Sequence, residues 1–131
     1  MTRPPPRVLL VMPDQWPRAM VRAELRERGY DAVGARSLLE ALVLEREPAR
    51  GPVRAILIDQ RAVARGGRRL LARVRERYPG VALLLIGSAV VDPGTGAWNR
   101  VLRRPASVGA VVAAIRELVP LPPGATHPVD R

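Results

Sequence analysis

The sequence contains no cysteine, no lysine and no phenylalanine, and it has a single histidine among its 131 residues. Without cysteine, disulfides, thiolate metal sites and thiol nucleophiles are excluded. The histidine, His127, lies in a proline-rich C-terminal segment, where a solvated side chain is expected. The longest apolar stretch, "VALLLIGSAVV", is shorter than the roughly 20 residues of a membrane-spanning helix. We therefore expect a cytoplasmic protein with no membrane segment.

The charge is strongly positive. The chain has 22 basic residues, all of them arginine, against 12 acids, and a formal net charge of +10. This charge permits an anionic partner, but a bias toward arginine is equally typical of a genome's base composition. Apolar residues make up 47% of the sequence, enough for a core of ordinary size in a single domain.

Short apolar runs alternate with amphipathic segments along the chain. The runs predict strands at 8–11, 31–35, 53–59, 81–87 and 100–104, and the amphipathic segments predict helices at 17–28, 38–44, 67–78 and 108–118. In the first helix, the spacing predicts that Met20, Val21 and Leu25 point inward. Ser37 and Ser107 stand where the N-caps of the second and last helices are expected.

This alternation predicts an α/β fold with an open, doubly wound, five-stranded parallel sheet, because each crossover returns the chain to the same edge. The segment "SAVVDPGTGAWN" contains a proline and two glycines where a fourth helix is due, so that helix is predicted to be shortened or absent. The predicted domain covers residues 8–119, between an extended arm (1–7) and a proline-rich tail or linker (120–131).

In such sheets the functional crevice lies at the carboxyl ends of the strands. The residues at these ends resemble, in order and spacing, those of the receiver (CheY-like) domain of two-component response regulators, from Arg7 to Val119. The third strand, "AILIDQR", places Asp59 at the family's phosphoacceptor position, and "VLRRP" places Arg104 and Pro105 at its Lys-Pro pair. The resemblance implies a flavodoxin-like (βα)₅ fold.

The sequence departs from this family at the metal site. Receivers use a pair of acids after the first strand to bind Mg²⁺, but Met12 and Pro13 occupy those positions here, and Asp14 comes one residue late. Magnesium requires hard oxygen ligands, and a thioether is a poor substitute. We therefore expect no metal and no other cofactor.

Three further receiver positions have also changed. Gly87 occupies the family's hydroxyl position, with Ser88 one place later, and Val101 replaces its switch aromatic. Arg104 replaces a compact ammonium with a planar guanidinium. We expect Arg104 to form a static ion pair with Asp59.

These departures favour a pseudo-receiver that acts by protein–protein interaction, is not regulated by aspartyl phosphorylation and is not an enzyme. The alternative is a phosphorylatable receiver that uses Asp59, with Asp14 as an improvised Mg²⁺ ligand. The partner would be a signalling or regulatory protein or a second copy of the chain. Trp98 and Val101 are candidates for its surface.

A third interpretation is a nucleic-acid-associated module. Arg61, Arg65, Arg69 and Arg73 recur every four residues and would form one basic stripe if the third helix began early. No aromatic residues alternate with these arginines to stack on bases, so support for this interpretation is weak.

Overall fold

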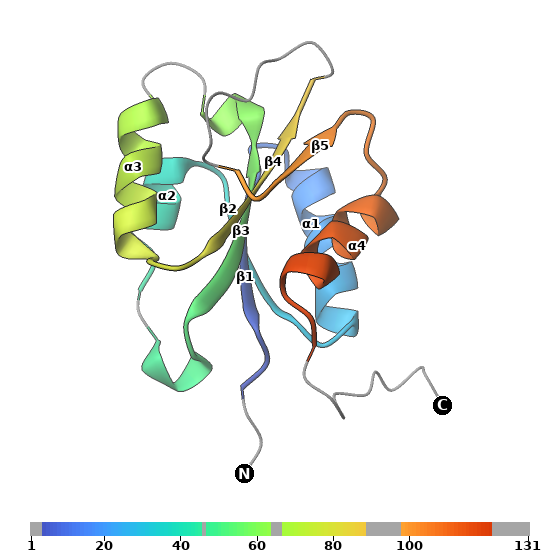
Figure 1. Cartoon of the computed structure of the whole chain (residues 1–131), viewed down its shortest axis with the longest axis horizontal. Coiled ribbons are helices and arrows are strands. Elements are labelled where there is room, and N and C mark those ends of the chain that lie inside the picture. The colour runs from blue at the N-terminus through green and yellow to red at the C-terminus, as the bar shows by residue number, and fades with distance from the viewer. Residues whose placement is uncertain (1–3, 46, 64–66, 89–97, 122–131) are drawn as a thin grey trace.

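Among the described residues, five strands form one sheet that is parallel throughout (Figure 1). The computed structural model describes residues 4–45, 47–63, 67–88 and 98–121. The strands are β1 (Arg7–Val11), β2 (Asp31–Ala35), β3 (Val53–Asp59), β4 (Ala82–Gly87) and β5 (Arg100–Arg103). Their order is β2-β1-β3-β4-β5, which confirms the predicted doubly wound topology.

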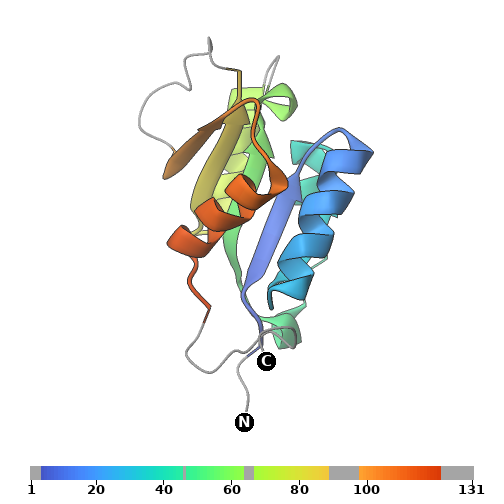
Figure 2. The same cartoon turned by 90° about the vertical axis from the view of Figure 1, so that its right-hand side faces the viewer.

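Helices cover both faces of the sheet (Figures 1 and 2). α1 (Gln15–Glu27) and α4 (Val108–Leu118) pack on one face, and α2 (Leu38–Leu42) and α3 (Gly67–Arg77) pack on the other. Two short 3₁₀ turns, η1 (Pro48–Arg50) and η2 (Gln60–Ala62), flank β3.

The central strands β1, β3 and β4 are buried on both faces, so their successive side chains enter two separate cores. On β1, Val8 and Leu10 join the α1/α4 core, whereas Leu9 and Val11 join the α2/α3 core. This explains why the strands are continuously apolar and do not alternate with polar residues. β1 begins at Arg7, which the sequence pattern placed in the arm, and Arg7 is buried.

Local signals set the helix ends. The hydroxyl of Ser37 accepts a hydrogen bond from the Glu40 amide, and that of Ser107 accepts one from the Ala110 amide, so both predicted N-caps are present. After α1, Gly29 adopts a φ of 105°, a left-handed conformation that glycine reaches at little cost.

Two helix predictions were wrong in detail. Met20 is exposed, whereas Val21 and Leu25 are buried. Met20 and Val21 are about 100° apart around the helix axis, and only the face with Val21 and Leu25 meets the sheet. The second helix ends at Leu42, before Leu44.

The predicted reduction of the fourth receiver helix concerns a segment that lies mostly outside the described residues, at positions 89–97. The five strands and four helices named above nevertheless account for the predicted fold class.

Candidate functional site

Asp59 is the centre of the candidate site at the carboxyl edge of the sheet. It ends β3, and only 1% of it is exposed. Its Oδ1 accepts hydrogen bonds from the Arg61 backbone amide (2.9 Å) and from the Arg61 Nε (3.2 Å). Its Oδ2 accepts one from Arg61 Nη2 (2.9 Å) and another from Arg104 Nη2. The predicted ion pair with Arg104 is therefore present, together with a second guanidinium that the sequence analysis did not assign to Asp59.

These contacts keep Asp59 ionised. Burial alone would raise the pKa of its carboxyl group. The side-chain and backbone hydrogen bonds from Arg61 oppose burial, as do the charges of Arg104 and Arg61, and the net result is a pKa below the ordinary value of 3.8. The carboxylate is thus charged at neutral pH.

Arg61 also joins Asp59 to Asp14. Its Nη2 lies 2.8 Å from Asp14 Oδ2 and 2.9 Å from Asp59 Oδ2. Hydrogen bonds to Asp59 and then to Asp14 raise the pKa of Arg61 above its ordinary value. Asp14 does reach the site, but the group it contacts there is a guanidinium. The Arg61 guanidinium thus lies between two carboxylates, in the position where a metal cation would be expected.

The first strand supplies no carboxylate to the cleft. Met12 is buried in the α1/α4 core, and its backbone oxygen accepts a hydrogen bond from Arg18 Nη1 (2.6 Å). The Pro13 oxygen lies 3.4 Å from the same nitrogen. One guanidinium thus contacts both backbone oxygens that these positions could offer to a metal.

The residues present do not fit Mg²⁺. The ion prefers several oxygen ligands in near-octahedral geometry, and the two carboxylates that the structure describes at this edge, Asp14 and Asp59, are already bound to Arg61. Within the described residues, no group of three or more histidine, cysteine, aspartate or glutamate side chains is placed to hold a metal ion.

A glutamine fills the hydroxyl position of the receiver pattern. Gly87 is buried at the end of β4, and a Cβ atom added there would lie 2.7 Å from Gln60 Oε1. That oxygen accepts a hydrogen bond from the Ser88 backbone amide (3.0 Å). Gln60 therefore takes the space that a serine or threonine side chain would need, and glycine at 87 leaves room for it. No motif in the sequence indicated this role for Gln60.

Above these residues lies a cleft of about 480 Å³. Apart from Asp14, Asp59, Arg61 and Arg104, its lining is apolar or proline: Met12, Pro17, Val21, Ile86, Pro105, Ala106, Val108 and Val111. The peptide bond between Arg104 and Pro105 is cis.

The candidate partner residues near β5 are only partly accessible. Trp98 is half-buried against the α2/α3 core, and Val101 is half-buried on β5. By contrast, Trp16 and Met20 on α1 are 77% and 54% exposed. They lie four residues apart, on one face of the helix. The helical spacing did not indicate this pair, because it predicts Met20 to point into the core.

The predicted basic stripe does not include Arg61. That residue lies on η2, where its guanidinium binds Asp59, at the end of β3, and Asp14. Arg65 lies outside the described residues, whereas Arg69 and Arg73 are exposed on α3. None of the helices in the described part of the chain is long and apolar enough to span a membrane.

Comparison with solved structures identifies the fold. The chain is similar to the signal receiver domain of an HD domain-containing protein from Pseudomonas fluorescens Pf-5, with 24% identity, a TM-score of 0.67, and coverage of 87% of this chain and 94% of that chain. It is also similar to a response regulator receiver domain protein from Clostridium thermocellum, with 16% identity, a TM-score of 0.70, and coverage of 87% and 94%.

A third similar structure is described as an adenylate cyclase from Rhodopirellula baltica, with 21% identity, a TM-score of 0.69, and coverage of 86% of each chain. No family model matches the sequence, and no curated protein matches it. At these identities the likeness establishes the fold alone. The chain has the receiver (CheY-like) fold.

Proposed function

We propose that this chain is a pseudo-receiver, a non-enzymatic module of a signalling or regulatory system. It presents a fixed surface to a protein partner, and its conformation does not depend on phosphorylation of Asp59. The receiver fold supports the signalling role, and the contacts of Asp59 support the loss of the phosphorylation switch.

The observation that carries the proposal is the saturation of the Asp59 carboxylate. An ionised carboxylate has about four lone-pair sites, and Asp59 accepts hydrogen bonds from four donors, three on Arg61 and one on Arg104. To attack a phosphoryl group, an oxygen would have to give up these bonds. It would do so without the metal ion that normally neutralises the charge of the transferred group.

The partner surface is proposed from exposure. Tryptophan side chains that become buried on binding contribute much of the binding energy of many protein interfaces. Trp16 is the most exposed large apolar side chain among the described residues. Met20 lies four residues further along α1, on the same face of the helix, so the two form a small apolar patch. A second copy of this chain is the alternative partner. Its involvement would appear as a dimer that Trp16→Ala dissociates.

Beryllofluoride with Mg²⁺, which mimics an aspartyl phosphate, tests the proposal. The amide NMR spectrum of the native chain should not change when both are added, because Asp59 remains bound to Arg61 and Arg104. Shifts centred on Asp59 would instead support a phosphorylatable receiver.

A restored variant is the matched positive control. Met12→Asp with Pro13→Asp returns two carboxylates to the cleft, and Arg61→Ala removes the guanidinium that binds both Asp59 and Asp14. This variant should acquire Mg²⁺ affinity that the native chain lacks. Magnesium affinity of the native chain equal to that of the restored variant would contradict the proposal.

The nucleic-acid interpretation predicts a different result. Retention of DNA or RNA that falls steeply with salt, and is lost in an Arg69→Glu, Arg73→Glu variant, would replace the proposed partner with nucleic acid. The pseudo-receiver proposal expects no such retention.

A further inference from the structure

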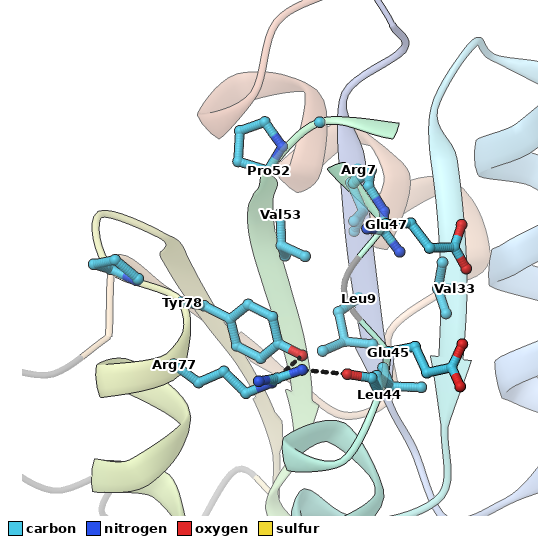
Figure 3. A pocket seen from close by; sticks show the side chains of 13 residues that line it. Arg7, Leu9, Val33, Leu44, Glu45, Glu47, Pro52, Val53, Arg77 and Tyr78 are labelled. Carbon is cyan, nitrogen blue, oxygen red and sulfur yellow. Dashed lines mark hydrogen bonds between the residues drawn. The ribbon is translucent and has the colours of Figure 1, made fainter. Parts of the chain in front are cut away.

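A second cavity lies far from Asp59, at the amino ends of the strands (Figure 3). It has a volume of about 400 Å³ and is open to solvent on one side. Its walls come from the starts of β1 and β3, from β2, from the end of α3 and from the chain that follows α2. Since α2 ends at Leu42, the chain beyond it leaves this part of the sheet uncovered. Volumes of roughly 300–1,000 Å³ are typical of small-molecule sites.

The middle of the cavity is apolar. Leu9, Val33, Leu44 and Val53 line it, together with the ring of Tyr78 (Figure 3). The polar groups at its α3 end already have partners. The Tyr78 hydroxyl donates to the Ala41 backbone oxygen (2.7 Å), and Arg77 donates to the Leu44 backbone oxygen. This end of the cavity therefore suits an apolar group.

Arg7 lies at the opposite end and differs from these groups. Its side chain is only 10% exposed, and it lines the cavity from the start of β1. Within the described residues, Arg7 Nε is a buried side-chain nitrogen with no hydrogen-bond acceptor. A buried donor without an acceptor is costly. Because Nε itself is buried, a ligand would contact the part of the guanidinium that lines the cavity.

Asp31, the carboxylate that forms an ion pair with Arg7 within the described residues, is already engaged by another group. Asp31 Oδ2 lies 3.4 Å from Arg7 Nε, but Arg50 takes both oxygens of Asp31, through Nε (2.9 Å) and Nη2. Hydrogen bonds to Asp31 and then to Glu47 raise the pKa of Arg50 above its ordinary value. Asp31 is thus shared between two guanidiniums, and Arg7 has the weaker contact.

We propose that this cavity binds a small organic acid with a single carboxylate and an apolar body. The carboxylate would accept hydrogen bonds from the guanidinium of Arg7, and the apolar body would lie against Leu9, Val33 and Val53. Arginine is suited to this role because its planar fork matches a carboxylate. Glu45 and Glu47 lie on the β2 side of the cavity (Figure 3) and repel any anion, a doubly charged phosphate monoester more strongly than a single carboxylate. This site is independent of the cleft above Asp59.

The test uses octanoate as the probe and follows the amide NMR spectrum of the full chain. Octanoate should give saturable shifts at Val33, Val53 and neighbouring amides. Octanol has the same chain without the charge and should bind about tenfold more weakly, as expected for the loss of a charge-assisted hydrogen bond. Octylammonium and inorganic phosphate should not bind at this site. These comparisons need no variant.

Two variants and a control locate the contact. Arg7→Gln should weaken octanoate binding about tenfold, whereas Arg54→Gln removes an equal charge from an exposed position on β3 and should leave binding unchanged. Val33→Phe fills the cavity with Arg7 intact and should abolish binding even if Arg7→Gln fails to fold. Equal binding of octanoate and octanol, tighter binding of octylammonium, or no shift at these amides with millimolar octanoate would each overturn the proposal.

Discussion

The guanidinium of Arg61 should contribute measurably to stability, by an amount that depends on pH. Arg61→Gln removes two charged hydrogen bonds to Asp59, from Nε and Nη2, and leaves the backbone amide and Arg104 in place. Hydrogen bonds to charged groups contribute about 1.5–3 kcal/mol each when buried. The Arg61 side chain is 51% exposed, so water can replace part of this interaction. We expect a loss of about 1–2 kcal/mol in the free energy of unfolding at neutral pH.

The pH dependence follows from the lowered pKa of Asp59. Its pKa in the folded state is below the ordinary value of 3.8, so its ionic contribution is fully present above that value. The contribution is lost as the pH falls through the folded-state pKa. Removing Arg61 raises the pKa of Asp59, so in the variant the stabilising contribution of the ionised Asp59 is lost at higher pH than in the native chain. The two stabilities should therefore converge in acid.

Urea unfolding followed by circular dichroism measures this difference, at pH 7 and in steps down to about pH 3. Arg69→Gln is the matched control, because it removes the same charge from an exposed position on α3, and it should change stability by less than about 0.5 kcal/mol. A carboxyl carbon NMR titration of Asp59 provides a direct check. The reasoning would be refuted if Arg61→Gln lowered the free energy of unfolding by the same amount at pH 7 and at pH 3. It would also be refuted if the substitution did not lower this free energy at pH 7.

Three further substitutions test the packing around the site and the helix ends, each by the free energy of unfolding in urea. Gly87→Ala should cost about 1 kcal/mol, because the added Cβ displaces the Gln60 oxygen from its hydrogen bond with the Ser88 amide. The cost of Gly87→Ala should be smaller in a Gln60→Ala background, and additive costs of the two substitutions would argue against this contact. Tyr30→Phe should cost about 1–2 kcal/mol, since it leaves the Val119 backbone oxygen without its buried 2.6 Å hydrogen bond, and an unchanged midpoint would contradict this. Ser37→Ala should cost about 1 kcal/mol through the lost N-cap of α2, and Ser37→Asp should restore most of it.

The sequence predicted the fold well because its signals are local and agree with one another. Three of the strands end at a charged residue or a glycine, namely β3 at Asp59, β4 at Gly87 and β5 at Arg103. β2 and β3 have the bounds that the pattern predicts. The hydroxyl caps at Ser37 and Ser107 fix the starts of two helices. The pairing of Asp59 with Arg104 followed from the topology, which brings the ends of β3 and β5 to one edge.

The rest of the site depends on side-chain conformations that spacing alone does not encode. Arg61 was assigned to a helical stripe, although it stands two residues after an aspartate at a strand end. In that position its amide can bond to the carboxylate and the side chain can fold back onto it. The spacing of an aspartate at a strand end and an arginine two residues later is therefore a local signal for the contact between Asp59 and Arg61. The space between Gln60 and Gly87 could not be inferred from spacing, because it depends on how closely β4 approaches η2.

The position of β5 has a consequence for self-association. It is the last strand of the sheet and only four residues long, and an exposed arginine stands at each of its ends, Arg100 and Arg103. The unpaired backbone groups of an edge strand can form hydrogen bonds with a strand of another chain, and edge strands that are short and charged make this pairing less favourable. Two molecules that met along this border would bring like charges together. A dimer should therefore not form by pairing of two β5 strands.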